Sequence, residues 1–262
     1  MRFSTLEREV LKLIDACEGR VGLVIASNDG KIEINHDEKF PSASLIKLPI
    51  LIEGFRQFDR GLQDLHESIP ISHTDRVEGS GVIHALSSDL DLKIIDLMTL
   101  MIIVSDNIAT NLLIERLGME QINKCMRFIG MKNSQLNRKM MDFAALKNGV
   151  DNYTTANDMI MCLKAIAERE YLTIESVEQS LRMMEKQQFK DKLAATISDE
   201  EMIVANKTGG LPGVEHDCAQ FRYKDEVIYA AVLIDRLPYQ SAGQQTLSSI
   251  GNLISAYIKK GN

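Results

Sequence analysis

The 262-residue chain contains no tryptophan, only five prolines and only four cysteines. The cysteines are scattered without a C-x-x-C pair, at Cys17, Cys125, Cys162 and Cys218. This spacing favours reduced, mostly buried thiols and leaves two disulfides as an alternative. The five histidines never occur at H-x-x-x-H or another ligand spacing, so we expect neither a metal site nor a cofactor.

The chain also lacks a basic region and a long apolar run. Its net charge of −7 at pH 7 disfavours binding to phosphate backbones, so we expect no nucleic-acid partner. No stretch reaches the roughly 18 apolar residues of a membrane span. Residues 1–20 mix charges into their apolar positions, whereas a signal peptide needs an unbroken apolar centre. We therefore expect a cytoplasmic protein as the sequence is written, or a secreted one if a leader has been removed.

Hydrophobic periodicity predicts strands near both ends of the chain and helices between them. Residues 21–26 and 31–35 alternate on either side of a turn, which is typical of a hairpin. Three more strands are predicted at 201–210, 217–223 and 226–235. Helical spacing predicts helices at 4–17, 92–104, 108–117, 120–128, 174–187 and 243–259, and another after an N-cap at Thr155 with Asp158.

This order of elements predicts an α+β fold in a single domain over residues 1–262. Strands from both termini would form one antiparallel sheet, with helices flanking it and a helical lobe beside it. We place the α/β lobe at about 1–40 and 190–262, and the helical lobe at about 41–189. A chain with 45% hydrophobic residues and this length can bury such a core.

A serine and a lysine stand one helical turn apart in residues 40–51, which read FPSASLIKLPIL. Ser44 and Lys47 share a helix face at this spacing. A desolvated lysine loses part of its charge and can then act as the base for a serine nucleophile. About one S-x-x-K is expected by chance in a chain this long, so the pair alone does not identify a site. Pro49 should kink this helix, because it lacks the N–H that would bond the Leu45 carbonyl.

Two further short motifs follow in order. VSDNIA contains Ser105, Asp106 and Asn107, which also suit a turn and N-cap before a helix at Ile108. NKTGG contains Lys207, Thr208, Gly209 and Gly210, which also suit a strand that ends in a bend. Each motif is short, but the ordered set of three is specific.

The set of SLIK, SDN and KTGG resembles the serine β-lactamase and penicillin-binding protein superfamily, and is most similar to class A β-lactamases. The resemblance covers nearly the whole chain. It implies the β-lactamase or transpeptidase fold and opening of β-lactam amide bonds through a Ser44 acyl-enzyme. It also implies a small-molecule β-lactam or related acyl substrate, no cofactor, and a monomer.

The resemblance assigns catalytic roles residue by residue. Ser44 is the expected nucleophile and Lys47 its activating base. The backbone N–H groups of Ser44 and Gly210 would form the oxyanion hole. Ser105 would relay a proton to the leaving nitrogen, and Lys207 would lower the cost of that relay.

Substrate contacts are implied in the same way. Asn107 would hold the amide of the substrate's side chain, and Lys207 with Thr208 and Gly209 would bind its carboxylate. His216 stands where many class A enzymes have an arginine, so it could contact the carboxylate, and that contact would weaken as pH rises through ~6.5. It could also form a triad with Asp217 and Ser44, or be a rim histidine without a role.

The loop before residue 153 departs from the class A pattern. Aligning Arg138 with the family's loop arginine puts Met140 where class A enzymes have the glutamate that activates the deacylating water. Asp142 is the next acid and a possible deacylation base, while Asp151 or Asn152 would close the loop. We hypothesise that the protein acylates on Ser44 and deacylates slowly.

Three alternatives stay open at this point. A D,D-peptidase or an esterase of the same fold would use the same acylating residues on another substrate. A β-lactam-binding receptor would stay acylated, which Met140 favours. The glycine-rich segment 77–86 is expected to wall the cleft with Val82 and Ile83.

Overall fold

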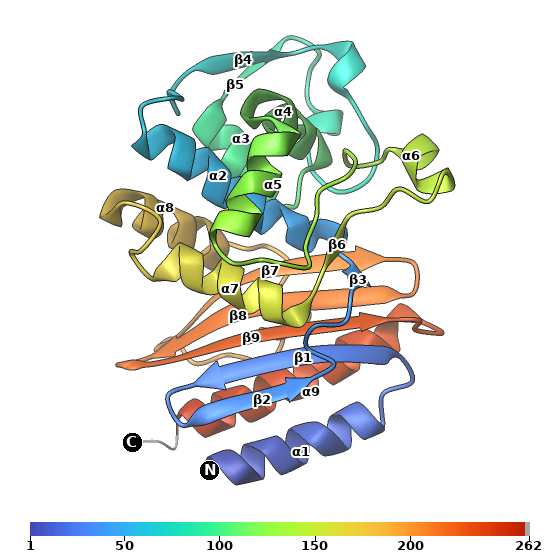
Figure 1. Ribbon diagram of the computed structural model, residues 1–262, viewed down its shortest axis with the longest axis vertical. Coiled ribbons are helices and arrows are strands. Elements are labelled where there is room, and N and C mark those ends of the chain that lie inside the picture. Colours follow the sequence, from blue (N-terminus) through green and yellow to red (C-terminus); the bar gives the residue numbers. More distant parts are fainter. Residues whose placement is uncertain (260–262) are drawn as a thin grey trace.

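A computed structural model describes residues 1–259, and its centre is a five-stranded antiparallel sheet in the order β2-β1-β9-β8-β7 (Figure 1). The strands are β1 Arg20–Ser27, β2 Gly30–Ile34, β7 Met202–Leu211, β8 Val214–Tyr223 and β9 Glu226–Asp235. The first two strands come from one end of the sequence and the last three from the other. The predicted α+β fold, with one antiparallel sheet built from both termini, is confirmed.

Two terminal helices cover one face of this sheet. The helix α1 (Phe3–Asp15) lies beside α9 (Gln240–Ile258), below the sheet in Figure 1. Strand alternation divides β1 between two cores, because Leu23 and Ile25 pack toward these helices while Val24 packs on the opposite face.

The remaining helices lie on the opposite side of the sheet, above it in Figure 1. They are α2 Lys47–Asp59, α3 Ile94–Ile103, α4 Asn107–Leu117, α5 Met119–Phe128, α6 Phe143–Lys147, α7 Ala156–Ala167 and α8 Ile174–Glu185. Two small ribbons join them: β3 (Phe40–Pro41) pairs with β6 (Tyr153–Thr154), and β4 (Ser68–Ile71) pairs with β5 (Leu90–Lys93). No helix within residues 1–259 is long and apolar enough to cross a membrane.

Local structure differs from the sequence-based expectation at three places. The break near Pro49 is a 3-10 segment at Ala43–Ile46 before α2, and Pro49 occupies the first turn of α2, where its missing N–H has no intrahelical acceptor. The helix predicted from residue 92 begins at Ile94, because residues 90–93 pair as β5. Thr155 caps α7 as predicted, but Asp158 accepts bonds from backbone N–H groups at 132 and 133.

The sheet and α9 hold the segment before β7 very closely. A Cβ on Gly251 of α9 would lie 1.9 Å from the carbonyl oxygen of Leu193, which is backbone and cannot rotate away. Leu193 directly follows Lys192, whose ammonium nitrogen lies 2.7 Å from the Gly209 carbonyl in β7. The glycine therefore lets α9 fix a segment that borders the end of β7.

Gly251→Ala is expected to destabilise the protein. Alanine favours a helix interior by about 1 kcal/mol, but the clash forces α9 away from Leu193, and overpacking of this kind costs about 3 kcal/mol. We expect the unfolding midpoint in a thermal melt to fall by roughly 5 °C or more. Gln245→Ala on the exposed side of α9 is the control and should change it little. An unchanged midpoint for Gly251→Ala would contradict the close approach.

Candidate active site

The 3-10 segment Ala43–Ile46 carries Ser44 at the junction of the sheet and the helices. Ser42 N–H bonds the Asn152 carbonyl at 2.8 Å, and Leu45 is fully buried, so both sides of the segment are anchored. A Cβ on Gly209 would lie only 3.2 Å from the Cβ of Ala43, so the glycine lets β7 approach closely. Ser44 thus lies directly beside the end of β7.

Ser105 links the two lysines of the predicted site. Lys47 Nζ bonds the Ser105 carbonyl at 2.7 Å, Ser105 Oγ at 3.0 Å and Asn107 Oδ1 at 2.9 Å. Lys207 Nζ donates to the same Ser105 Oγ at 3.1 Å and to the Thr208 carbonyl at 2.8 Å. Among the residues that the structure describes, no hydrogen bond joins Ser44 Oγ to Lys47 Nζ. The two lysines are therefore assembled around Ser105, which lines the smaller cavity together with Ser44.

Both lysines are fully buried, and this burial changes their protonation. Burial is the largest cause that lowers the pKa of Lys47 well below its usual value, and the charge of Lys207 lowers it further. Burial likewise lowers the pKa of Lys207 to about 7. A buried lysine at this site can therefore hold a free amine near neutral pH, as the sequence argument required.

Three of the six non-glycine residues with a positive φ in the described part of the chain lie around the same site. Ala43, Ser105 and Met141 are non-glycine residues with φ of 44°, 54° and 62°. Asp106, next to Ser105, is buried and caps α4 through Ile108 N at 2.9 Å. The same carboxylate accepts from Val82 N at 2.7 Å. These fixed partners hold Ser105 in a conformation that its side chain disfavours.

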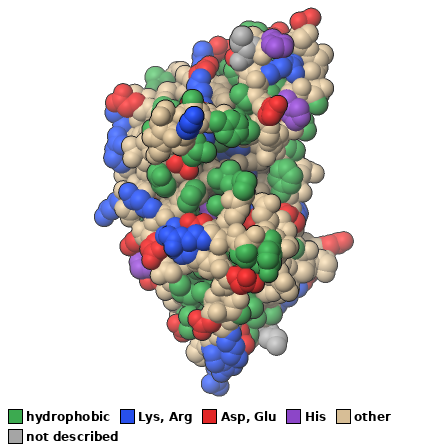
Figure 2. Space-filling model, turned by 90° about the vertical axis from the view of Figure 1, so that its right-hand side faces the viewer, with side chains coloured by type: hydrophobic (Ala, Val, Ile, Leu, Met, Phe, Trp, Pro, Cys, Tyr) green, Lys and Arg blue, Asp and Glu red, His purple; other side chains and the backbone are tan. Residues whose placement is uncertain are grey.

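Two cavities meet at Ser44 and Gly210. The larger, of about 380 Å³, opens toward the 137–152 loop, and the smaller, of about 190 Å³, opens toward Ser105 and Thr208. Figure 2 views the side of the molecule that carries this loop, where hydrophobic side chains gather near a hollow in the middle of the face. Apolar side chains that line the larger cavity are Met140, Met141, Phe143, Leu146, Leu211 and Pro212.

Expected substrate contacts are distributed between these cavities. Asn107 lines the larger one and Thr208 the smaller one. Gly210 is exposed in both, whereas Gly209 is buried against Ala43. The glycine pair thus serves two purposes, with close packing at 209 and open backbone at 210.

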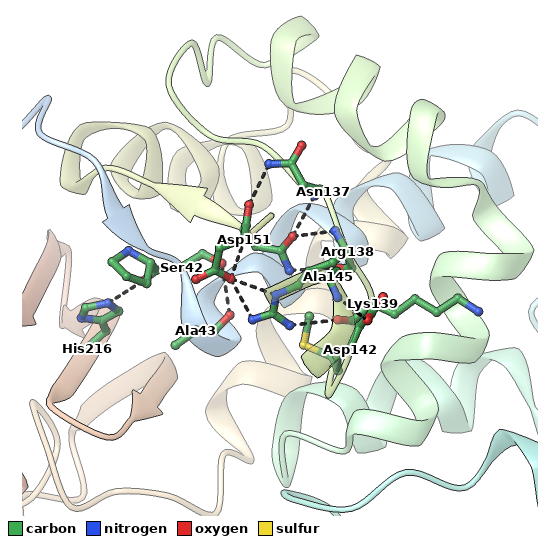
Figure 3. A network of polar contacts seen from close by, with 12 residues as sticks. Ser42, Ala43, Asn137, Arg138, Lys139, Asp142, Ala145, Asp151 and His216 are labelled. Carbon is green, nitrogen blue, oxygen red and sulfur yellow. Dashed lines mark hydrogen bonds and ion pairs between the residues drawn. The ribbon is translucent and has the colours of Figure 1, made fainter. Parts of the chain in front are cut away.

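An ion pair closes the loop of residues 137–152. Arg138 binds Asp151 through its guanidinium, with nitrogen–oxygen distances of 2.7 and 2.9 Å (Figure 3). Asn152 holds the backbone at the start of the loop, because its Oδ1 accepts hydrogen bonds from the N–H groups of Asn137 and Arg138 at 2.7 and 3.0 Å. The sequence left Asp151 and Asn152 open, and the structure makes Asp151 the partner of the loop arginine.

Met140 occupies a backbone position that is held from both sides. Its N–H donates to Asn111 Oδ1 at 2.7 Å, and its carbonyl accepts from Asn111 Nδ2 at 3.1 Å. Its side chain is 8% exposed and lines the same cavity as Ser44. A residue at position 140 therefore faces the site where an acyl group on Ser44 would lie.

Asp142 is not brought to the Ser44 cavity. Its Oδ1 accepts the Ala145 N–H at 2.9 Å and so caps the short helix α6 (Figure 3). The side chain lines a neighbouring cavity of about 230 Å³, together with Met140 but without Ser44. The geometry does not support Asp142 as the deacylation base, because its carboxylate is committed to a helix cap on the far side of Met140.

His216 faces the protein interior. It is fully buried on β8, its Nδ1 accepts the Ile234 N–H at 3.0 Å, and its Nε2 is 2.8 Å from the Pro41 carbonyl (Figure 3). The ring must therefore be the neutral tautomer with the proton on Nε2, and burial lowers its pKa to about 4. Neither a carboxylate contact nor a triad with Ser44 agrees with these bonds, so the substrate-binding role expected for His216 is corrected.

The cleft wall also differs in detail from the expectation. Ile83 is fully buried and Val82 is exposed, and neither lines the two cavities, whereas Gly79 and Ser80 line the larger one. Asp106 fixes this backbone by accepting the N–H groups of both Val82 and Ile83.

Sequence reasoning missed a buried ion pair at the smaller cavity. Lys192 and Glu215 form it beside Gly210, with side-chain exposures of 6% and 3%. It also missed the Asn111 clamp, which is the pair of hydrogen bonds from the Asn111 side chain to the backbone N–H and carbonyl of Met140. These partners are far apart in the sequence and carry no local pattern that could have revealed them. No group of three or more His, Cys, Asp or Glu side chains within residues 1–259 is arranged to hold a metal ion.

The fold and the arrangement of Ser44, Lys47, Ser105 and Lys207 agree with the resemblance inferred from the three motifs. A profile of the β-lactamase enzyme family matches residues 5–258, so the chain belongs to that family. A β-lactamase from Sphaerobacter thermophilus DSM 20745 is 32% identical with a TM-score of 0.90, covering 97% of this chain and 96% of that chain. The resemblance inferred from the three motifs is thereby confirmed.

Two more distant structures share the fold. PBP-A is 23% identical with a TM-score of 0.89, covering 98% of this chain and 97% of that chain. An ancestral class A β-lactamase is 23% identical with a TM-score of 0.87, covering 96% of this chain and 99% of that chain. The same fold thus belongs to a β-lactamase and to a penicillin-binding protein.

Arg138→Ala is expected to loosen the 137–152 loop. The substitution leaves Asp151 without its guanidinium, and that end of the loop keeps only the bonds of Asn152 and the bond from the Asn137 amide to the Asp151 carbonyl. We expect amide hydrogen exchange over residues 139–150 to accelerate by about tenfold, with little change in the sheet. Arg182→Ala, which breaks an exposed helix pair with Glu178, is the control. Unchanged exchange in the loop would contradict the closing role of Arg138.

Proposed function

We propose that the protein opens β-lactam rings through an acyl-enzyme on Ser44 and deacylates slowly. The position of Ser105 Oγ is the main support for acylation at Ser44. This atom lies 3.0 Å from Lys47 Nζ and 3.1 Å from Lys207 Nζ, and Ser105 lines a cavity together with Ser44. Family membership supports hydrolysis as the class of reaction. A Leu-to-Glu variant of PBP-A, a protein of the same fold, is known in an acyl-enzyme complex with penicillin G.

Acylation begins when Lys47, as a free amine, takes the proton of Ser44. The Ser44 oxygen then bonds the β-lactam carbonyl carbon, and the ring C–N bond breaks. Ser105 gives its hydroxyl proton to the leaving nitrogen and recovers a proton from Lys47. Once Lys47 has taken the Ser44 proton, both lysines can donate to Ser105 Oγ, and the hydroxyl hydrogen is then left to point toward the substrate.

The oxyanion would lie between the N–H groups of Ser44 and Gly210. The exposed backbone at Gly210 supports this, because a Cβ there would meet no atom closer than 3.8 Å and the strand surface is open. Asn107 would hold the acyl side of the substrate, and Thr208 with Lys207 the leaving-group side. The apolar lining of the larger cavity favours acyl groups with apolar side chains.

We expect slow deacylation because, among the residues that the structure describes, no unpaired carboxylate lines the larger cavity. Met140 holds the position that faces Ser44, and a thioether cannot take a proton from water. Asp151 lines the larger cavity but is bound to Arg138. The second candidate is therefore a β-lactam-binding receptor that stays acylated, and the same residue, Met140, favours it.

Nitrocefin should give a burst of colour that approaches one equivalent of protein, followed by slow release. Intact-mass spectrometry of the same mixture should show a persistent adduct of the opened β-lactam, because acylation outruns deacylation. Ser44→Ala, as the control, should give neither signal. Sustained colour with little adduct would contradict slow deacylation, and the absence of both signals would move the function to an ester or peptide substrate.

Met140→Glu is expected to speed deacylation by about a hundredfold, the usual contribution of a positioned general base. The Asn111 clamp holds the backbone of residue 140, so a glutamate there would project into the cavity as Met140 does. Decay of the acyl-enzyme is followed by mass spectrometry after excess β-lactam has been removed. Met140→Gln has nearly the same shape without a base and should decay like the wild type. Equal decay of the Glu and Gln variants would refute position 140 as the place for a base.

A further inference from the structure

The peptide between Gly209 and Gly210 lies at the end of β7 that borders the two cavities. β7 is an edge strand, and its neighbour in the sheet is β8. Gly209 stands opposite His216 of β8, and Lys192 Nζ lies 2.7 Å from the Gly209 carbonyl oxygen and 3.2 Å from the His216 carbonyl oxygen. One nitrogen reaches both oxygens because the two carbonyls face each other, so the Gly209 carbonyl points toward β8.

The N–H of the same peptide points to the opposite side. The peptide is trans, and a trans peptide carries its carbonyl and its N–H on opposite sides. This N–H belongs to Gly210, which lines both cavities together with Ser44. The peptide therefore accepts a cation on the β8 side and presents its N–H at the free edge of β7, where the oxyanion is proposed to lie.

Lys192 is held at this carbonyl by fixed partners. Its side chain is 6% exposed, and the two carbonyls and the Glu215 carboxylate use all three of its N–H donors. Glu215 accepts a second hydrogen bond from Gln240 at 3.0 Å, and the N–H of Leu193 donates to the Asp217 carboxylate at 3.1 Å. A buried ion pair that is anchored in this way does not open cheaply, since separating it leaves a charge without compensation.

The preceding peptide of β7 is bonded differently. Lys207 Nζ donates to the Thr208 carbonyl at 2.8 Å, and the N–H of that peptide belongs to Gly209. In a strand the N–H and the carbonyl of one residue point to the same side, so the Gly209 N–H faces β8. Of these two peptides, the one that Lys192 bonds is the one whose N–H ends at the cavity.

A cation at a carbonyl oxygen strengthens the N–H at the other end of the same peptide. Amide resonance moves electrons from nitrogen to oxygen, and a cation beside the oxygen favours that form. The N–H then becomes a better donor, and hydrogen bonds in a chain strengthen one another by about 10–30% per bond in this way.

We propose that Lys192 is a positioning residue for the oxyanion hole, which polarises the Gly209–Gly210 peptide through its carbonyl and so makes the Gly210 N–H a stronger donor to the oxyanion. The inference rests on the proposed acyl-enzyme chemistry. Glu215 compensates the buried charge of Lys192. The carboxylate contact assigned to Lys207 and Thr208 is not affected.

Two double variants remove the cation without changing the net charge of the pair. In the first, the Met–Leu variant, Lys192→Met and Glu215→Leu put apolar side chains of similar volume in its place, a change that folded proteins often tolerate. In the second, the Gln–Gln variant, Lys192→Gln and Glu215→Gln keep an uncharged N–H donor for the Gly209 carbonyl. Lys207 and Thr208 are unchanged in both variants, so their contacts with a substrate cancel in the comparison.

The first readout is the infrared stretch of the ester carbonyl on Ser44, isolated as the difference between adducts of ¹²C- and ¹³C-labelled penicillin G. A stronger hydrogen bond to this oxygen lowers the stretching frequency. We expect the lowest frequency in the wild type, a higher one in the Gln–Gln variant and the highest in the Met–Leu variant. The second-order rate constant of acylation should fall about tenfold in the Met–Leu variant, because a donor is weakened and not removed.

The second readout needs no substrate. The amide proton resonance of Gly210 in the free protein should move upfield in both double variants, because its peptide loses the cation. Glu185→Gln is the control, since it breaks an ion pair with Arg222 and neither residue lines the two cavities. A purely structural role of the Lys192–Glu215 pair would lower the melting temperature but would not order the carbonyl frequencies.

Two outcomes would overturn the inference while the proposed function stands. One is an acyl-enzyme whose carbonyl frequency is the same in the wild type and in the folded double variants, and the other is a Gly210 amide proton that does not shift. If the Met–Leu variant does not fold, the Gln–Gln variant decides by the same two measurements. Absence of a Ser44 adduct in the wild type would instead overturn the proposed function, and the inference with it.

Discussion

The buried amine of Lys47 is the constraint on which the rest of the site depends. A lysine without solvent must find acceptors, and Lys47 finds three of them in Ser105 and Asn107. These residues come from the turn between α3 and α4, so the lysine fixes that turn against the start of α2. The same burial that demands these contacts lowers the pKa of Lys47, so one physical cause provides both the geometry and the proposed base.

The surrounding fold holds this arrangement rigid from three directions. Gly209 lets β7 pack against Ala43, Asp106 ties the 82–83 backbone to the start of α4, and Arg138 closes the long loop on Asp151. Ala43 and Ser105 keep left-handed backbone angles within this framework. Such strain persists only where neighbouring contacts over-determine it, and here it lies beside the proposed nucleophile and the proposed proton relay.

The sequence was informative where function depends on local spacing. Asp106 as a helix cap follows from a rule that acts over three or four residues, and it occurs where it was expected. Ser44 and Lys47 were expected on one helix face, but Ser44 lies on the 3-10 segment before α2 and, in the described part of the chain, no hydrogen bond joins the two side chains. Local spacing could not predict whether the His216 side chain is buried. Residues of a strand alternate between the two faces of the sheet, and the pairing with neighbouring strands decides which face is interior. The cap that Asp142 makes at Ala145 could not be foreseen for a similar reason, since it depends on where α6 begins. The Lys192–Glu215 pair joins distant segments and had no sequence signal.

The two halves of the proposed reaction depend on different parts of the molecule. In the proposal, acylation uses Ser44 on the 3-10 segment together with buried side chains of α2, β7 and the α3–α4 turn, which bond one another. Deacylation depends on one side chain of the 137–152 loop, at a position whose backbone Asn111 clamps through N–H and C=O alone. These two hydrogen bonds do not depend on which side chain residue 140 has. The proposal therefore expects that an exchange of methionine for an acid at position 140 changes deacylation and leaves acylation intact, because the backbone contacts of that residue do not depend on its side chain.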